Sequence, residues 1–235
     1  MTPDRYPRKW GARSSHHIAL SLIGLGQGRR ALDVGCGRGH LLEELNSRDW
    51  KSSGIDNDAS DVANCIARGL DVAEFDISDG LPTASGTFDL VVLADVLEHL
   101  RDPLRVLRSA HRLLNPGATI VVSVPNVAHA SVRVQLLFGR FRYSARGIFD
   151  RTHLKFFTKR TLMELLTDAG FKIDQRTATA VPLENVWPQL NQSRFGRIVL
   201  KVNDWLPSLW AGGLAYQFVV VASPLGESDD SSGSV

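Results

Sequence analysis

The stretch ALDVGCGRGHLL, residues 31–42, joins an apolar segment that ends in Asp33 to a loop of alternating glycines and then to leucines at helical spacing. Gly35, Gly37 and Gly39 form a G-x-G-x-G pattern, and glycine adopts positive φ and lets a ligand lie against the backbone. The leucines predict a helix whose N-terminal amides face that ligand. The order strand, glycine loop, helix predicts a site for a small cofactor.

An acid also ends the next apolar segment. Residues 52–56 predict a short strand, and its last residue, Asp56, lies seventeen residues after Gly39. In doubly wound folds an acid about 20 residues after the glycine loop accepts hydrogen bonds from ribose hydroxyls. Asp58 is the alternative, but its place in the turn suits a helix cap. Asp56 is therefore the predicted ribose ligand.

Further apolar segments predict a sheet that is mainly parallel. Strands are expected at 72–75, at 88–94 and at 118–126, with a helix from Pro103 to Asn115 between the last two. The segment at 88–94 is apolar on both faces, as in a strand buried within a parallel sheet. A closing strand is expected at 215–221. Helices and strands in alternation predict a doubly wound α/β fold.

Length and composition fit one compact enzyme domain rather than two domains with independent chemistry. The 235 residues are 43% hydrophobic and 22% charged, with a formal net charge of +2. We expect an N-terminal arm at 1–13, a domain at 14–224 and a disordered tail at 225–235. Two cysteines offer no disulfide framework, and no leader or membrane span is recognised, so a cytoplasmic location is expected. The spacing of histidines and acids along the chain does not suggest a metal site.

Two longer stretches carry a family resemblance. SVPNVAHASVRVQLLFGRFRYSARGIFDRTHLKFFTKRTLMELLTDAGF, residues 123–171, and ADVLEHLRDP, residues 94–103, join the glycine motif. Together they resemble class I S-adenosylmethionine-dependent methyltransferases, in a subfamily associated with surface polysaccharide biosynthesis, and more distantly ubiquinone-pathway O-methyltransferases. The resemblance implies a Rossmann-like, mainly parallel seven-stranded sheet with helices on both faces. It also implies methyl transfer to an oxygen of a glycan or glycan precursor, with S-adenosylhomocysteine as product.

The motifs and the resemblance together define the predicted cofactor site. The resemblance places Asp76, which follows the third strand, near the adenine, and it places His16 of the N-terminal helix over the cofactor. The predicted cofactor ligands are Asp33, Gly35, Cys36, Gly37, Gly39, Asp56, Asn57, Asp76, Ile77, Ala94, Asp95 and His16.

The segment 126–157 is expected to form a lid over the cofactor, because ligands bind beyond the carboxyl ends of the strands. Within it, residues 128–138 predict a helix with Val132, Leu136 and Leu137 turned inward. Between Arg133 and Arg160 eight basic residues accompany a single acid. Such an imbalance favours an anionic acceptor, and a solvated lid surface is the alternative. The candidate acceptor ligands are Asn126, His129, Arg133, Arg142, Tyr143, Arg146 and Arg151.

A sugar hydroxyl is a poor nucleophile until a base takes its proton, and histidine, with a pKa of about 6.5, suits that task. His153 is the predicted base, with Asp150 orienting its ring. A histidine that only bonds the backbone is the alternative. His99, beside Glu98 after the fourth strand, is the second candidate for acid–base work.

The segment 182–213 is unusually aromatic. Ile198, Val202, Trp205 and Leu209 recur at nearly helical spacing, while Pro207 is expected to end or kink a helix there. Burial against the domain or in a homodimer is predicted. Contact with a lipid-linked acceptor or a membrane surface is the alternative.

Other functions remain open to different degrees. A nicotinamide-dependent reductase would need G-x-G-x-x-G spacing, and a nucleic-acid methyltransferase is disfavoured because an Asn-Pro-Pro-aromatic motif is absent from the sequence. The predicted partner is a small-molecule or glycan acceptor, nucleotide-linked or lipid-linked, and not a nucleic acid. A methyltransferase for a quinone or phenol and a non-catalytic cofactor-binding module stay as alternatives.

Overall fold

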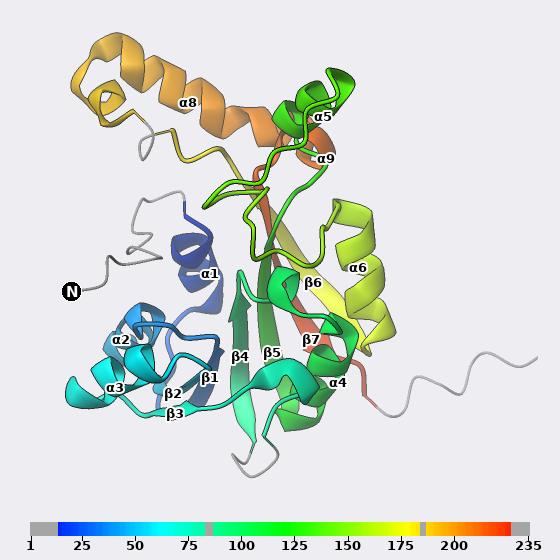
Figure 1. Ribbon diagram of the computed structural model, residues 1–235. Coiled ribbons are helices and arrows are strands. Elements are labelled where there is room, and N and C mark those ends of the chain that lie inside the picture. The colour runs from blue at the N-terminus through cyan, green and yellow to red at the C-terminus, as the bar shows by residue number, and fades with distance from the viewer. Residues whose placement is uncertain (1–13, 83–86, 184–186, 227–235) are drawn as a thin grey trace, which may run out of the picture.

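A computed structural model describes residues 14–82, 87–183 and 187–226, and its centre is a seven-stranded sheet (Figure 1). The strand order is β3-β2-β1-β4-β5-β7-β6, in which β7 runs antiparallel to both of its neighbours. The mainly parallel seven-stranded sheet is thereby confirmed. The strands are β1 (Arg30–Val34), β2 (Lys51–Asp56), β3 (Val72–Glu74), β4 (Phe88–Ala94), β5 (Leu114–Pro125), β6 (Phe171–Thr179) and β7 (Gln217–Pro224).

Helices cover both faces of this sheet because its central strands are apolar on both sides. In β5, Val121 packs toward α1 (Ser15–Ile23) and α2 (His40–Ser47), whereas Ile120 and Val122 pack toward α4 (Pro103–Leu113) and α6 (Lys159–Asp168). α3 (Ala59–Ala67) adds a smaller cluster beside the glycine loop. Two apolar layers against one sheet supply most of the hydrophobic stabilisation of such a domain.

The fifth strand begins earlier than expected. α4 ends at Leu113 and β5 starts at Leu114, so the residues 115–117 belong to the strand rather than to a turn. The register against β4 shifts between Phe88 and Leu90, which marks an irregularity that absorbs the proline and glycine of this stretch. The extra length does not alter the carboxyl end of β5, where the lid starts.

The lid and the aromatic segment stand away from the sheet at one end of the molecule (Figure 1). They contain α5 (Ala130–Leu137), η4 (Pro188–Gln192), α8 (Arg194–Leu209) and α9 (Ala211–Leu214). The base of the lid is closed by a bridge between Asn126 and Phe157. No helix in the described part of the chain combines the length and the apolar character needed to cross a bilayer.

One expectation for these helices is wrong, and the other is met to within two residues. In α5 only Val132 is buried, and it packs against Ile148 and Phe149. Leu136 and Leu137 are 48% and 81% exposed, because the helix projects from the body and the described residues do not cover this face. In α8 the helix ends at Leu209, two residues beyond Pro207. Proline has no N–H for the carbonyl four residues earlier, which agrees with a helix that stops close behind it.

The ends of the chain lie largely outside the described residues. The predicted arm at 1–13 and the tail beyond Leu225 and Gly226 fall there, so their predicted behaviour stays a prediction.

Candidate functional site

The order of the strands places the site. The strand order reverses between β1 and β4, since β2 and β3 lie on one side of β1 and β4 and β5 lie on the other. In open α/β sheets ligands bind beyond the carboxyl ends of the strands at such a point. Asp33 and the glycine loop follow β1, Asp56 ends β2, and Asp95 follows β4. Motifs far apart in the sequence therefore meet along one edge of the sheet.

The three glycines of the loop have different roles. A Cβ at Gly35 or Gly39 would lie 2.9 Å or 2.5 Å from side chains packed against the loop, so both positions need glycine for packing. A Cβ at Gly37, where φ is +49°, would enter space that is open to at least 4 Å among the described residues. Its amide donates to Asp56 Oδ2 at 2.7 Å. Gly37 is thus the glycine that leaves room for a ligand.

Two carboxyl groups lie under this loop. Asp33 is 3% exposed, and burial, helped by the nearby Asp56, raises the pKa of Asp33 to about 8. Besides Gly37, Asp56 accepts the amide of Asp58 at 2.9 Å, and each of its oxygens keeps a second lone pair for a ribose hydroxyl. Asp58 itself caps α3, as its place in the turn predicts. The pair is suited to a ligand that carries both hydroxyl groups and positive charge.

Asp95 is held by side chains that sequence reasoning missed. It has a positive φ of 60°, and its Oδ1 accepts from Ser123 at 2.8 Å and from Gln217 at 2.9 Å. Oδ2 accepts from Ser15 at 3.3 Å. A serine and a glutamine within otherwise apolar strands are the signal that was available. These bonds join α1, β5 and β7 to the carboxyl end of β4.

The remaining predicted cofactor ligands lie around the same edge. Asp76 is exposed and caps η1 (Ile77–Asp79), where it accepts from the amide and hydroxyl of Ser78. Asn57 follows β2 and Ala94 ends β4. Cys36 is buried within the glycine loop, and burial raises the pKa of its thiol. His16 lies in the first turn of α1, next to the serine that bonds Asp95.

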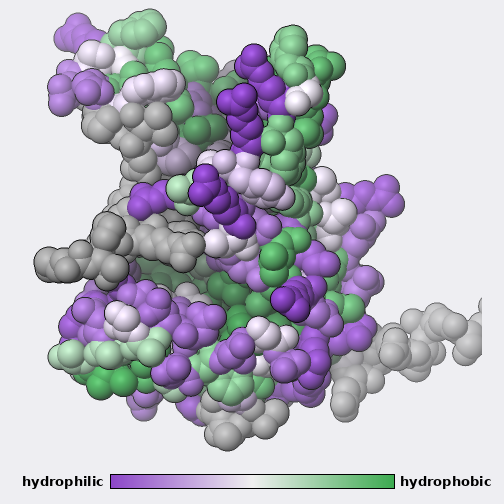
Figure 2. All heavy atoms as spheres, in the orientation of Figure 1, coloured by the Kyte–Doolittle hydropathy of each residue, from purple (hydrophilic) through white to green (hydrophobic). Residues whose placement is uncertain are grey.

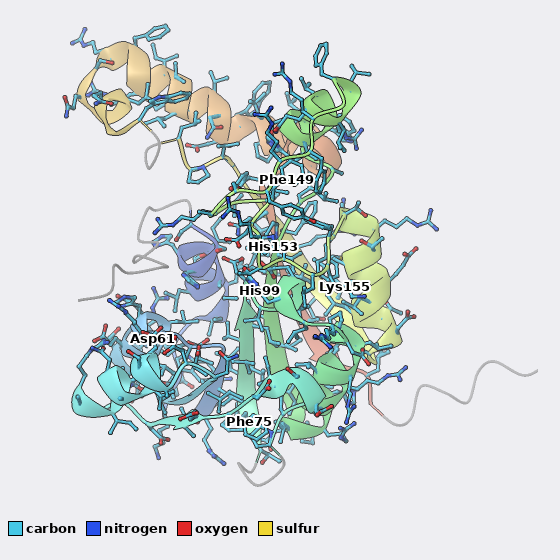
Figure 3. All side chains as sticks on the ribbon, viewed as in Figure 1. Asp61, Phe75, His99, Phe149, His153 and Lys155 are labelled. Carbon is cyan, nitrogen blue, oxygen red and sulfur yellow. The ribbon has the colours of Figure 1, made fainter. Side chains whose placement is uncertain are left out.

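Two histidines from distant segments meet beneath the lid (Figure 3). His99 ends η3 (Leu97–His99), and His153 comes from the lid, with 4.9 Å between the ring centroids. The lid is fixed here because the amides of Leu154 and Lys155 donate to the carbonyl of Glu98 at 2.7 and 3.0 Å. The contact that unites the pair is thus a backbone contact, which the sequence pattern does not reveal.

Backbone carbonyls determine which ring nitrogen carries the proton in each neutral histidine. Nδ1 of His99 lies 3.2 Å from the carbonyl of Thr152, and Nδ1 of His153 lies 3.1 Å from the carbonyl of Ile148. A carbonyl only accepts, so each Nδ1 donates and each neutral ring keeps its lone pair on Nε2. Burial, and then the nearby His153, lower the pKa of His99, which is therefore neutral near pH 7.

Asp150 orients the lid more than it orients the imidazole. Its Oδ1 accepts from the amide of Thr152 at 2.9 Å and from the hydroxyl at 2.7 Å. Burial raises the pKa of Asp150, but these two hydrogen bonds and the nearby histidines outweigh it and hold that pKa below its usual value. The group that accepts from His153 is the carbonyl of Ile148, so Asp150 acts on the ring through its charge.

Two predicted acceptor ligands, Asn126 and His129, have structural contacts, and their role toward an acceptor stays a prediction. Asn126 is fully buried, and its amide nitrogen donates to the carbonyls of Ala215 and Gly212 at 2.8 and 3.3 Å. His129 is 8% exposed and caps α5 by accepting from the amide of Ser131, and burial lowers its pKa. Both sit where the lid leaves β5, so they fix its path.

The predicted basic ligands lie farther out on the lid. The guanidinium of Arg133 stacks over Trp210 at 4.8 Å and donates to the carbonyl of Ala128 at 2.7 Å. Arg142, Arg146 and Arg151 are exposed, as is half of Tyr143. Figure 2 shows the surface hollowed between this lid and the α2–α3 side of the body. Arg142, Arg146 and Arg151 stay candidate acceptor ligands.

One group of side chains has the composition of a metal site. The carboxylate of Glu98, which is 1% exposed, and the rings of His99 and His153 offer ligand atoms that all lie within 4.8 Å of one another. The expectation of no metal site rested on spacing along the chain. These three residues come together only because the lid folds back, so spacing alone did not expose them.

The fold and this edge define a Rossmann-like α/β protein with a site for a cofactor that carries a ribose. Residues 10–176 match the model of a family described as "Methyltransferase domain", and the chain belongs to this family. S-adenosylmethionine is accordingly its cofactor, and the residues fit it. The open space over Gly37 admits a ligand against the backbone, and Asp56 offers acceptors for a ribose.

Solved structures confirm the fold. A putative methyltransferase from Haloferax volcanii, in complex with the Trm112 activator, is 18% identical with a TM-score of 0.62 over 90% of this chain and 89% of that chain. A methyltransferase from Mesorhizobium loti is also 18% identical, with a TM-score of 0.60 over 89% and 97%. The [4+2]-cyclase SpnF is 22% identical, with a TM-score of 0.58 over 90% and 80%. The last example shows that this fold alone does not fix the reaction.

Sequence relatives are closer. A protein named ubiquinone biosynthesis O-methyltransferase from Psychrobacter arcticus is 31% identical over 69% of this chain and 66% of its own length. One of the same name from Ruegeria pomeroyi is 32% identical over 68% of this chain and 67% of its own length. The matched part thus spans about two thirds of these relatives.

Proposed function

We propose that the chain transfers the methyl group of S-adenosylmethionine to a hydroxyl oxygen of a sugar in a glycan or glycan precursor. The observation that carries the proposal is the pair His99 and His153, whose Nε2 lone pairs are both left free to accept by the carbonyls on Nδ1. Two imidazole Nε2 atoms that can accept a hydrogen bond suit the removal of a hydroxyl proton.

In this proposal Nε2 of His153 takes the proton of the acceptor hydroxyl as its oxygen becomes nucleophilic. His99 stays neutral and accepts a hydrogen bond from the same acceptor. When bound, S-adenosylmethionine supplies the electrophilic methyl carbon. The chain contributes position and exclusion of water, because the lid is held over the site by Leu154, Lys155 and the carbonyl of Glu98.

The charge of the lid supports an anionic acceptor. Arg142, Arg146 and Arg151 are exposed on a segment that carries eight basic residues and one acid between positions 133 and 160. Arginine binds carboxylate and phosphate with two parallel hydrogen bonds. A uronic acid, a nucleotide-linked sugar or a sugar on a lipid pyrophosphate carries such groups. The two free cysteines suit a cytoplasmic reaction.

A quinone precursor or another phenol is the second candidate acceptor, because the relatives at 31% and 32% identity are named for ubiquinone biosynthesis. A phenol has a pKa of about 10 and needs a weaker base than a sugar hydroxyl. The two candidates therefore differ in how strongly they depend on His153.

The test measures release of S-adenosylhomocysteine with a nucleotide-linked uronic acid, its neutral hexose analogue and a catechol. We expect turnover of the uronic acid and a higher KM when Arg142→Gln and Arg146→Gln are combined. The matched control combines Lys51→Gln and Lys172→Gln, which lie exposed on β2 and β6. Faster reaction of the catechol would favour the phenol alternative, and equal reaction of the neutral hexose would remove the anionic acceptor. Loss of turnover in EDTA would assign the histidines to a metal instead of to proton transfer.

A further inference from the structure

The helix α8 exposes a continuous apolar stripe. Its exposed side chains are Phe195 (74%), Ile198 (59%), Val202 (50%), Trp205 (58%) and Leu209 (57%). Their spacing alternates between three and four residues, which places all five on one face. The opposite face contains the buried residues that fix the helix to the body, including Leu200 and Pro207. An exposed stripe of this size on a folded domain indicates a contact surface.

The lid helix extends this surface. Leu137 and Phe138, at the end of α5, are 81% and 71% exposed, and the contact between Arg133 and Trp210 joins α5 to the end of α8. In Figures 1 and 2 both helices crown the same end of the molecule, with apolar side chains at the outer tip of α5. We call the exposed residues of α5 and α8 the crown.

An apolar groove runs along the side of the stripe. It is lined by Leu183, Ile198, Val202 and Leu206. Ile198 and Val202 belong to both the stripe and the groove, so the apolar surface continues from the exposed face of α8 toward the body. The groove enlarges the area that can be buried by an apolar partner.

The charge of the crown selects the partner. Together α5 and α8 carry four basic residues, Arg133, Arg194, Arg197 and Lys201, and one acid, Asp204. On α8, Arg194, Arg197 and Lys201 each precede a residue of the stripe by one position, which places them along its border. A second copy of the chain docked on this face would bring equal basic groups together, which is unfavourable.

We infer that the crown docks on an anionic lipid bilayer, with α8 lying in the plane of the interface. A helix with aromatic and aliphatic residues on one face and basic residues at its border is the form that binds at such an interface. The apolar stripe enters the boundary of the acyl chains while the arginines and the lysine meet acidic headgroups. The inference does not require the acceptor to be a sugar.

The experiment measures co-flotation of the full chain with vesicles of phosphatidylglycerol and phosphatidylcholine, or of phosphatidylcholine alone. We expect binding to the anionic vesicles that weakens with salt. Combining Arg194→Gln, Arg197→Gln and Lys201→Gln should weaken binding about a hundredfold, since each basic residue near such a surface contributes about a factor of five. Combining Ile198→Ser and Trp205→Ser should weaken it at least tenfold.

Matched controls change the same residue types elsewhere. Lys51→Gln, Lys172→Gln and Arg176→Gln remove three exposed charges from the sheet side, and Ile66→Ser removes a side chain that is 57% exposed on α3. Neither control should change binding, and cofactor affinity should stay unchanged in every variant. Equal binding to neutral vesicles, or variants that bind as tightly as the parent, would overturn the inference. So would light scattering that shows a dimer which the Ile198→Ser and Trp205→Ser pair dissociates, because the crown would then be a subunit interface.

Discussion

The cofactor edge and the lid with α8 are built in different ways. At the cofactor edge, Gly37, Asp56 and Asp95 are held by hydrogen bonds to the ends of the central strands, and the surrounding side chains are buried. The lid with α8 instead exposes its large apolar residues and is joined to the sheet by a few backbone contacts, such as those on the carbonyl of Glu98. The sheet thus fixes the cofactor edge, whereas the lid and α8 form exposed surfaces, which we propose meet the acceptor and a membrane.

The largest expected effect tests whether the lid supplies chemistry. His153→Gln should lower the single-turnover rate of methyl transfer by roughly 10²–10⁴-fold, because it removes a general base. Cofactor affinity should not change, since the residue belongs to the lid and not to the glycine loop. His129→Asn is the control, because it keeps a cap on α5 and should leave the rate nearly intact. A rate for His153→Gln within a few-fold of the parent would leave the residue with positioning alone.

The second prediction separates packing from binding at the cofactor edge. Gly37→Val places a side chain in open space, so it should lower affinity for S-adenosylmethionine at least tenfold, and its positive φ should cost only about 1–2 kcal/mol of stability. Gly39→Val has the same backbone strain and also forces Leu70 and the thiol of Cys65 aside, so it should lower the free energy of unfolding by about 1–3 kcal/mol more than Gly37→Val does. Calorimetry and chemical denaturation measure the two effects. The reverse pattern would contradict the roles assigned to these glycines.

The third prediction concerns Asp33. Its pKa is about 8 when folded and 3.8 in the unfolded chain, so the native state retains a proton that the unfolded state has lost between these values. Stability of the cofactor-free protein should therefore fall as pH rises through this window, by up to about 1.4 kcal/mol per pH unit from this group. Asp33→Asn should flatten the slope in denaturation curves from pH 5 to 8. An unchanged slope would mean that Asp33 is already ionised in the native state.

The contrast also explains what the sequence could predict. The glycine loop, the end of β2 at Asp56 and six of the seven strands could be predicted, because each depends on neighbours in the chain and on the apolar period of a buried sheet. The strand β6 was not located, because its exposed outer residues give no such apolar run. The meeting of His99 with His153 was not readable, because it depends on amides bonding the carbonyl of Glu98. Leu137 was placed inward because helical spacing identifies a face but does not say what lies against it. Function was limited in the same way, since a cyclase shares this fold.

The smallest expected effect tests the lid's own stability. Val132→Ala removes methyl groups from the cluster with Ile148 and Phe149 and should destabilise the lid by roughly 1–2 kcal/mol. Leu137→Ser changes a side chain that is 81% exposed and should alter the free energy of unfolding by no more than about 0.5 kcal/mol. Hydrogen exchange of the amides between 130 and 157 measures the lid directly, and the Val132 variant should exchange faster there while β4 and β5 stay protected. If Leu137→Ser instead loosens the lid as much as Val132→Ala does, Leu137 is packed inward in solution. Leu137 would then not belong to the exposed surface of the crown.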